Sequence, residues 1–302
     1  MTTGLAELLF FATTAGYVAA GLLFVATLAG WSFAAPGALG ARAAPIVLGL
    51  AAATHAAHIV VSSLVLRICP VEGMHFAMSV LSMFACVVFL VARIRYRIDV
   101  VGAFVVPFAL TFLLGSRIVT PSTPEPSARV KSAILPLHVT VNLLGDGLFA
   151  LAFATAALYL VQERHLKQKN FGGVFRRLPP LDALDRAEHR FLLAGFPLLT
   201  LGILTGTLWA RRVELGGATD VWRAVFGYAT WVLYAAVLLL RAAAGWRGRR
   251  AAYGTIAGFG FAVLVLILYL IRSYTPSAGV PATVGVALPS TEVVAAAGDV
   301  PP

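Results

Sequence analysis

Long runs of apolar residues, separated by short polar connections, repeat along almost the whole chain. Eight of these runs approach or exceed the ~20 residues that an α-helix needs to cross a bilayer. They cover 6–30, 44–67, 73–92, 100–119, 134–162, 190–210, 222–242 and 252–272. The runs are continuous rather than alternating, and only helices or closed barrels satisfy the backbone in lipid. The pattern therefore predicts an all-α, polytopic bundle of about eight transmembrane helices.

The composition strengthens this prediction. Of the 302 residues, 60% are hydrophobic and 12% are charged, against roughly 25% charged residues in an ordinary soluble domain. The net charge of +10 does not point to nucleic acid, because the basic residues lie between the hydrophobic runs. We expect an integral protein of a bacterial cytoplasmic membrane that contacts membrane lipid and no nucleic acid.

The basic residues also predict the orientation. Alternate connections hold fifteen of the Lys and Arg residues, and the other set of connections holds eight. The positive-inside rule places the richer set in the cytoplasm and both termini outside. Its longest member is 163–189, a predicted basic loop that includes His165 and His189. We expect residues 1–274 to form the membrane domain and residues 275–302 to be a disordered outer tail.

Few residues in the predicted spans have side chains that could act in catalysis or bind a metal or cofactor. Cys69 and Cys86 form no CxxC motif, so covalent haem attachment and a cysteine zinc site find no support. The sequence has no nucleophile elbow, phosphate loop or HExxH motif. We therefore expect no hydrolytic or phosphotransfer activity.

A polar stripe occupies the fifth predicted span, where His138, Asn142 and Asp146 recur every four residues. This spacing places all three on one face of a helix, with Asp146 deeper than His138 in the predicted orientation. The stripe is consistent with a cofactor pocket in which an imidazole binds a metal and its neighbours orient it. It is equally consistent with hydrogen bonds that hold neighbouring helices together.

Two histidines in the second predicted span, His55 and His58, are three residues apart and share a face. They could meet one ligand, or each could be satisfied by a neighbouring polar group. His75 lies just inside the third predicted span. Gly202 and Gly206, like Gly254 and Gly258, have the GxxxG spacing that allows close helix packing.

Four segments together resemble the cytochrome c assembly family of haem-handling membrane proteins, which includes the system II haem lyase subunit and HemX-like proteins. The segments are LHVTVNLLGDGLFALAF, LDALDRAEHRFLLAGFPLLTLGILTGTLWA, ATWVLYAAVLLLR and GWRGRRAAY. The resemblance runs from about His58 to Tyr274. It implies an eight-helix bundle with an outer tryptophan-rich loop that holds haem.

The resemblance also implies roles for single residues. His138 takes the position of the outer axial histidine and is expected to ligate the haem iron, and Trp209 opens the tryptophan-rich loop. Trp222 falls near the end of this loop, and His58 is a looser match to a bundle histidine. The implied ligand is haem b, and the implied partners are a second assembly subunit and apocytochrome c.

The chain departs from the family pattern at several positions. The WGxxWxWD core is absent, and Leu239 and Arg272 stand where relatives have histidines. We therefore expect a HemX-like protein that delivers haem or regulates its delivery and is not itself an enzyme. Two alternatives stay open: a small-solute or ion transporter that uses Asp146, His55 and His58, and a regulatory membrane protein of haem biosynthesis that acts through the 163–189 loop.

Overall fold

The structure of the protein is a computed structural model that describes residues 2–34, 39–66, 74–96, 98–118, 134–169, 178–210 and 218–274. Within these ranges it contains eight long helices and no strand. The helices are α1 (Thr2–Ala29), α2 (Leu39–Leu66), α3 (Met74–Tyr96), α4 (Gly102–Ile118), α5 (Ile134–Lys167), α6 (Leu181–Ala210), α7 (Ala218–Ala243) and α8 (Arg249–Tyr274). Two short 3-10 turns, η1 (Ser32–Ala34) and η2 (Asp99–Val101), follow α1 and precede α4.

All eight helices are long and apolar enough to cross a membrane, which confirms the all-α bundle predicted from the sequence. Most helix ends differ from the predicted span ends by a few residues. The predicted ends at residues 67, 73 and 119 lie outside the described residues, as does the tail 275–302. Neither the predicted orientation nor the predicted disorder of the tail is tested by the structure.

The predicted loop 163–189 is wrong at both of its ends. Helix α5 continues to Lys167 and α6 already begins at Leu181, so His165 and His189 are helical. Ion pairs of i,i+4 spacing stabilise both extensions: Glu163 with Lys167, and Asp182 with Arg186. The hydropathy pattern marks only the part of a helix that lies in lipid, and these charged turns extend beyond it.

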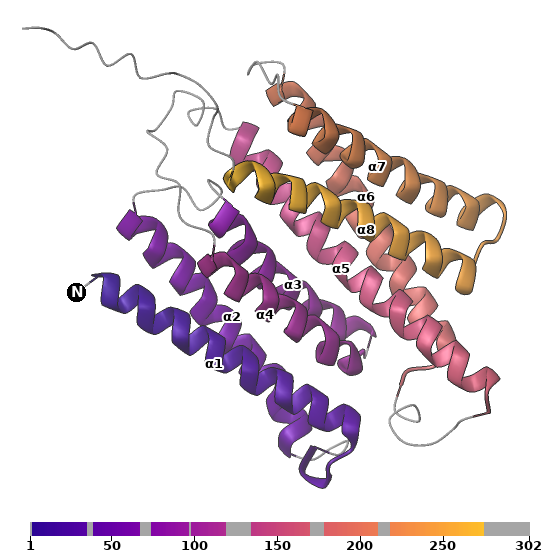
Figure 1. Cartoon of the computed structure of the whole chain (residues 1–302). Helices are drawn as coiled ribbons and strands as arrows, with labels where there is room; N and C mark the ends of the chain where they lie inside the picture. The colour runs from indigo at the N-terminus through magenta and orange to yellow at the C-terminus, as the bar shows by residue number, and fades with distance from the viewer. Residues whose placement is uncertain are drawn as a thin grey trace, which may run out of the picture.

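The bundle consists of two groups of four helices. Figure 1 shows α1 to α4 on one side and α5 to α8 on the other, with all axes running along the same diagonal. Within the groups, the most extensive packing joins α1 to α2, α3 to α4, α5 to α6 and α7 to α8. Helix α5 is central, because it also packs against α3 of the first group and against α8.

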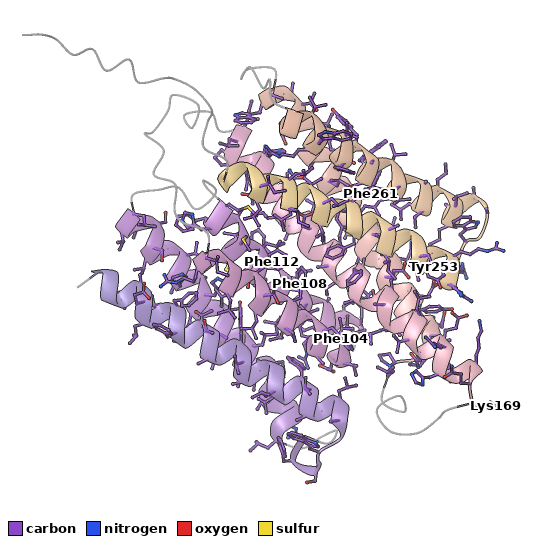
Figure 2. The ribbon with its side chains drawn as sticks, in the orientation of Figure 1. Phe104, Phe108, Phe112, Lys169, Tyr253 and Phe261 are labelled. Carbon is purple, nitrogen blue, oxygen red and sulfur yellow. The ribbon has the colours of Figure 1, made fainter. Side chains whose placement is uncertain are left out.

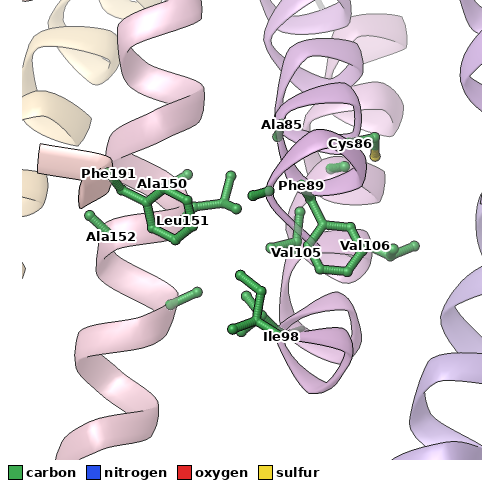
Figure 3. Close-up of a cluster of buried hydrophobic side chains, with 14 of the residues drawn as sticks. Ala85, Cys86, Phe89, Ile98, Val105, Val106, Ala150, Leu151, Ala152 and Phe191 are labelled. Carbon is green, nitrogen blue, oxygen red and sulfur yellow. The ribbon is translucent and has the colours of Figure 1, made fainter. Parts of the chain in front are cut away.

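A hydrophobic core joins the two groups. In Figure 3, Leu151 of α5 and Phe191 of α6 point toward Phe89 of α3 and Ile98, which precedes η2. All four side chains are buried. A second link is aromatic: Phe108 of α4 (labelled in Figure 2) has its ring centroid 6.1 Å from that of Phe259 of α8.

The outer surface of the bundle is apolar. Every helix carries exposed large hydrophobic side chains, for example Leu8, Leu64, Val91, Leu114, Val161, Leu204, Val232 and Ile267. Figure 2 shows side chains projecting from the outward faces of the helices on both sides of the bundle. An apolar surface of this extent is compatible with lipid and not with water, so the fold is that of an integral membrane protein.

Candidate functional site

His138 lies near the start of α5 and packs against the last turns of α6. Its Nδ1 is 2.8 Å from the carbonyl oxygen of Gly202, so the Nδ1–H donates to that oxygen. In a neutral imidazole the other nitrogen, Nε2, then carries a lone pair. Metal-binding histidines characteristically have this arrangement, with one ring nitrogen held by a carbonyl and the other available to the metal.

The neighbouring residue of the stripe, Asn142, supports this geometry. Its side-chain amide donates to the carbonyl oxygen of His138 at 2.7 Å and lies 3.1 Å from His138 Nδ1. Asn142 therefore fixes the first turns of α5 beside the imidazole. Asn142 thus contacts His138 from within α5, whereas Gly202 contacts it from α6.

Two glycines of α6 make room for this pair. A Cβ atom at Gly206 would lie 2.6 Å from Cε1 of His138, and a Cβ atom at Gly202 would collide with the side-chain amide of Asn142. The sequence predicted close helix packing at this GxxxG spacing, and the structure shows which side chains occupy the space. The glycines at 254 and 258 of α8 likewise receive side chains of α7, Val237 and Tyr234.

Asp146 lies one turn further along α5 than Asn142. It interacts electrostatically with Tyr234 of α7. The Tyr234 hydroxyl is buried and has no hydrogen-bond partner among the described residues. The stripe therefore continues from a site between α5 and α6 toward a second polar spot between α5 and α7.

His55 is the fully buried member of the histidine pair in α2. One ring nitrogen is 3.0 Å from the hydroxyl of Tyr17 in α1, and the other is 2.9 Å from the hydroxyl of Ser79 in α3. Both nitrogens are thus engaged, and His55 links three helices. Of the two interpretations that the sequence left open, a shared ligand or hydrogen bonds to neighbouring polar groups, the structure shows the second for His55.

His58 has a different environment from His55. Its Nδ1 is 3.0 Å from the carbonyl oxygen of Ala6, so this nitrogen donates and Nε2 keeps its lone pair. It lines a cleft of about 110 Å³ together with His75 and Arg117, among others. Both ring nitrogens of His75 are buried without a hydrogen-bond partner among the described residues. The cleft therefore brings together two histidines whose ring nitrogens are not all engaged by described residues.

The structure places the predicted site residues in two separate clusters. The first contains His138 and Asn142 with the turn of α6 around Gly202, and the second contains His58 with His75. No contact described between residues of α2, α3 and α5 joins His138 to either histidine of the cleft. The described contacts thus assign His138 and His58 to separate clusters, and the cleft of about 110 Å³ is smaller than the ~300–1,000 Å³ that is usual for ligand pockets.

The tryptophans of the predicted outer loop lie at the ends of α6 and α7. Trp209 is partly exposed in the last turn of α6, and Trp222 of α7 is 54% exposed and stacks on Phe226. Residues 211–217 between these helices lie outside the described residues, as does the side chain of Arg272. Leu239, at the position where the family resemblance implied a histidine, is exposed on α7.

Sequence reasoning missed that Gly202 holds the imidazole of His138. The polar stripe identified His138 as a candidate, and the GxxxG spacing of Gly202 and Gly206 predicted a close helix contact. Nothing in the sequence indicated that the histidine lies at that contact. A possible signal was that both patterns lie near the predicted outer ends of consecutive antiparallel spans. His75 was noted only by position, and its unpartnered ring could not be read from the sequence.

Comparisons with known proteins add an independent observation. The chain is 32% identical over 197 residues to the cytochrome c biogenesis protein CcsA of Guillardia theta, which covers 58% of this chain and 64% of that protein. It is 36% identical over 95 residues to protein HemX of Brevibacillus brevis, covering 31% and 35%. It is 28% identical over 201 residues to CcsA of Prochlorococcus marinus subsp. pastoris, covering 58% and 62%.

The chain thus spans less than two thirds of the length of these three relatives. The family described as cytochrome C assembly protein matches residues 68–277. This match includes α3 to α8 and therefore the His138 cluster, whereas His58 precedes it. Since it covers more than half of the chain, the protein belongs to the cytochrome c assembly protein family.

Proposed function

We propose that this protein binds haem at the outer end of α5 and α6 and acts in cytochrome c biogenesis, in haem delivery or its regulation. The observation that carries the proposal is the geometry of His138. Its Nδ1–H is held by the Gly202 carbonyl at 2.8 Å, which leaves Nε2 as a nitrogen ligand. Membership of the family and the likeness to CcsA and HemX proteins support the same function.

The residues around His138 fit a haem ligand in their chemistry. An imidazole is a common axial ligand of haem iron, and Asn142 and Gly202 fix its orientation. Trp209 and Trp222 border the connection from α6 to α7 and would offer aromatic faces to a porphyrin. The family resemblance implies haem b as the ligand, and the absence of a CxxCH motif is consistent with haem that is not covalently attached to this chain.

The protein would then serve as an accessory rather than a catalytic subunit. Leu239 stands where the family resemblance implies a histidine, and a leucine side chain supplies no second ligand. Thioether formation would use the cysteines of apocytochrome c, with a second assembly subunit as partner. We place the protein in a bacterial cytoplasmic membrane.

The transporter alternative has less support. It requires Asp146, His55 and His58 along one path, and both ring nitrogens of His55 are engaged by Tyr17 and Ser79. Asp146 lies in the other group of helices. The regulatory alternative, contact between the basic connection and an enzyme of haem biosynthesis, keeps its sequence basis but gains no structural observation.

The test is an absorption spectrum of protein purified from haem-replete cells. We expect a haem Soret band in the wild type and loss of most of the bound haem in His138→Ala, because the variant lacks the axial nitrogen ligand. His58→Ala, His165→Ala and His189→Ala should keep the band, because these residues lie away from the His138 cluster. Wild-type protein without haem would refute the function, and stoichiometric haem with an unchanged spectrum in His138→Ala would refute the ligand.

A further inference from the structure

A basic pocket opens at the opposite end of the bundle from His138, where α3 ends and α6 begins. It has a volume of about 220 Å³ and is lined by Arg95 and Tyr96 of α3 and by Ala183, Arg186, Ala187 and Arg190 of α6. The four residues of α6 follow the spacing i, i+3, i+4, i+7, so they share one face of the helix. Alanine at two of these positions leaves the space between the arginines open.

The positive charge of the pocket is only partly neutralised. Arg186 forms an ion pair with Asp182, one turn earlier in α6. Arg190 lies over the ring of Tyr96, 5.2 Å from its centroid, and forms no ion pair with a described carboxylate. Arg95 likewise forms no ion pair with a carboxylate of the described residues. Two guanidinium groups therefore face one small pocket without an anion among the described side chains, an arrangement that favours a bound anion.

Besides its arginines, the pocket has an aromatic and a small apolar part, formed by Tyr96 and by Ala183 and Ala187. The ring of Tyr96 meets that of Phe191 edge to face, with centroids 5.8 Å apart. Ile94, directly before Arg95, is 79% exposed on the outer surface of α3. In the predicted orientation the pocket lies at the cytoplasmic end of two membrane-spanning helices, α3 and α6. This combination suits an amphiphile better than a soluble ion.

We propose that the pocket binds the phosphate headgroup of an anionic phospholipid of the cytoplasmic leaflet. The pocket is smaller than the ~300–1,000 Å³ of sites for whole organic ligands, which matches a headgroup whose acyl chains remain in the bilayer. Basic pockets between transmembrane helices on the cytoplasmic side are a recurring site for such headgroups. The proposal does not depend on haem, since the pocket shares no residue with the His138 cluster.

The experiment is native mass spectrometry of the full chain in detergent, titrated with phosphatidylglycerol or phosphatidylcholine. We expect the wild type to retain phosphatidylglycerol preferentially and the double variant Arg95→Gln/Arg190→Gln to lose this affinity by about tenfold or more. Ala183→Leu, which fills the pocket and removes no charge, should lower it as well. The matched control Arg249→Gln/Arg250→Gln removes two exposed arginines outside the pocket and should bind like the wild type.

Two further measurements separate the possible results. Excess inorganic phosphate should leave the bound lipid in place; complete displacement would overturn the proposal in favour of a soluble phosphate site. Equal loss of phosphatidylglycerol in the control variant would overturn it in favour of unspecific surface charge. A variant is used to judge the proposal only if its thermal unfolding in phosphatidylcholine matches that of the wild type. If the double arginine variant does not meet this criterion, Ala183→Leu provides the test of the pocket.

Discussion

The imidazole of His138 lies over Gly206 because glycine has no side chain at that point of α6. An alanine Cβ would be 2.6 Å from Cε1 and 3.0 Å from Nδ1 of the ring, closer than van der Waals contact. The lack of a side chain at Gly206 of α6 therefore leaves the space that the candidate ligand His138 of α5 occupies. A glycine in mid-helix normally costs about 0.5–1 kcal/mol relative to alanine, so its presence here has a steric reason.

We predict that Gly206→Ala displaces the His138 ring, weakens haem binding and lowers stability by about 1–3 kcal/mol through overpacking. The readouts are the Soret absorbance of the purified variant and its thermal unfolding. Gly260→Ala in α8 is the matched control, because a Cβ atom there meets nothing within 4 Å; it should leave both properties unchanged or raise stability slightly. A Gly206→Ala protein with normal haem binding would show that the ring is not held by this contact.

Helices α6, α7 and the start of α8 are joined at their basic end by one buried carboxylate. Asp185 of α6 accepts a hydrogen bond from Arg241 of α7 at 2.5 Å and from the backbone N–H of Gly248 at 2.7 Å. The side chains of Asp185 and Arg241 are only 10% and 6% exposed. Gly248 has φ of 63°, a left-handed conformation that glycine adopts without strain. The turn between α7 and α8 is thus fixed by α6.

We predict that Asp185→Asn lowers the free energy of unfolding by about 3–5 kcal/mol, because it leaves the buried guanidinium of Arg241 without its counter-charge. Asp182→Asn is the control from the same helix: its ion pair with Arg186 has side chains 72% and 60% exposed, and its loss should cost about 0.3–0.5 kcal/mol. Thermal or denaturant unfolding in detergent compares the two. Similar destabilisation by both substitutions would contradict the role of Asp185.

At the scale of the whole molecule, the two groups of four helices separate the two histidine clusters. Helix α5 packs against α3 through apolar side chains such as Leu151 and Phe89 (Figure 3). The face of α5 that carries His138 is turned toward α6. The division of the bundle explains why the cleft at His58 and the cluster at His138 are distinct.

The orientation of the bundle is predicted by charge. With fifteen basic residues in one set of connections and eight in the other, we expect the termini outside and the connection from α5 to α6 in the cytoplasm. A periplasmic reporter fused after Thr275 should be active, whereas the same reporter inserted after Lys169 should be inactive. The reverse pattern would place His138 at the cytoplasmic face and would remove the basis for an outer haem site.

The sequence by itself determined the number and type of the spanning helices. A stretch of about 20 apolar residues has few alternatives in a bilayer, because its backbone must hydrogen-bond within the segment. The i,i+4 spacing likewise placed His138 and Asn142 on one face of α5, since that periodicity is a property of the helix alone. The charged turns that extend α5 to Lys167 and α6 back to Leu181 carry no hydropathy signal, and the sequence missed them.

Only the tertiary structure decided which neighbour each polar side chain meets. His55 and His58 have the same helical setting, yet one is engaged by two hydroxyl groups and the other keeps a free nitrogen. The pairing of His138 with Gly202, and of Asp185 with Arg241, joins residues more than fifty positions apart. In lipid all outward helix faces are similarly apolar, so hydropathy does not encode which faces pack together. That choice depends on the shapes of side chains from several helices, including the glycines that leave room for them.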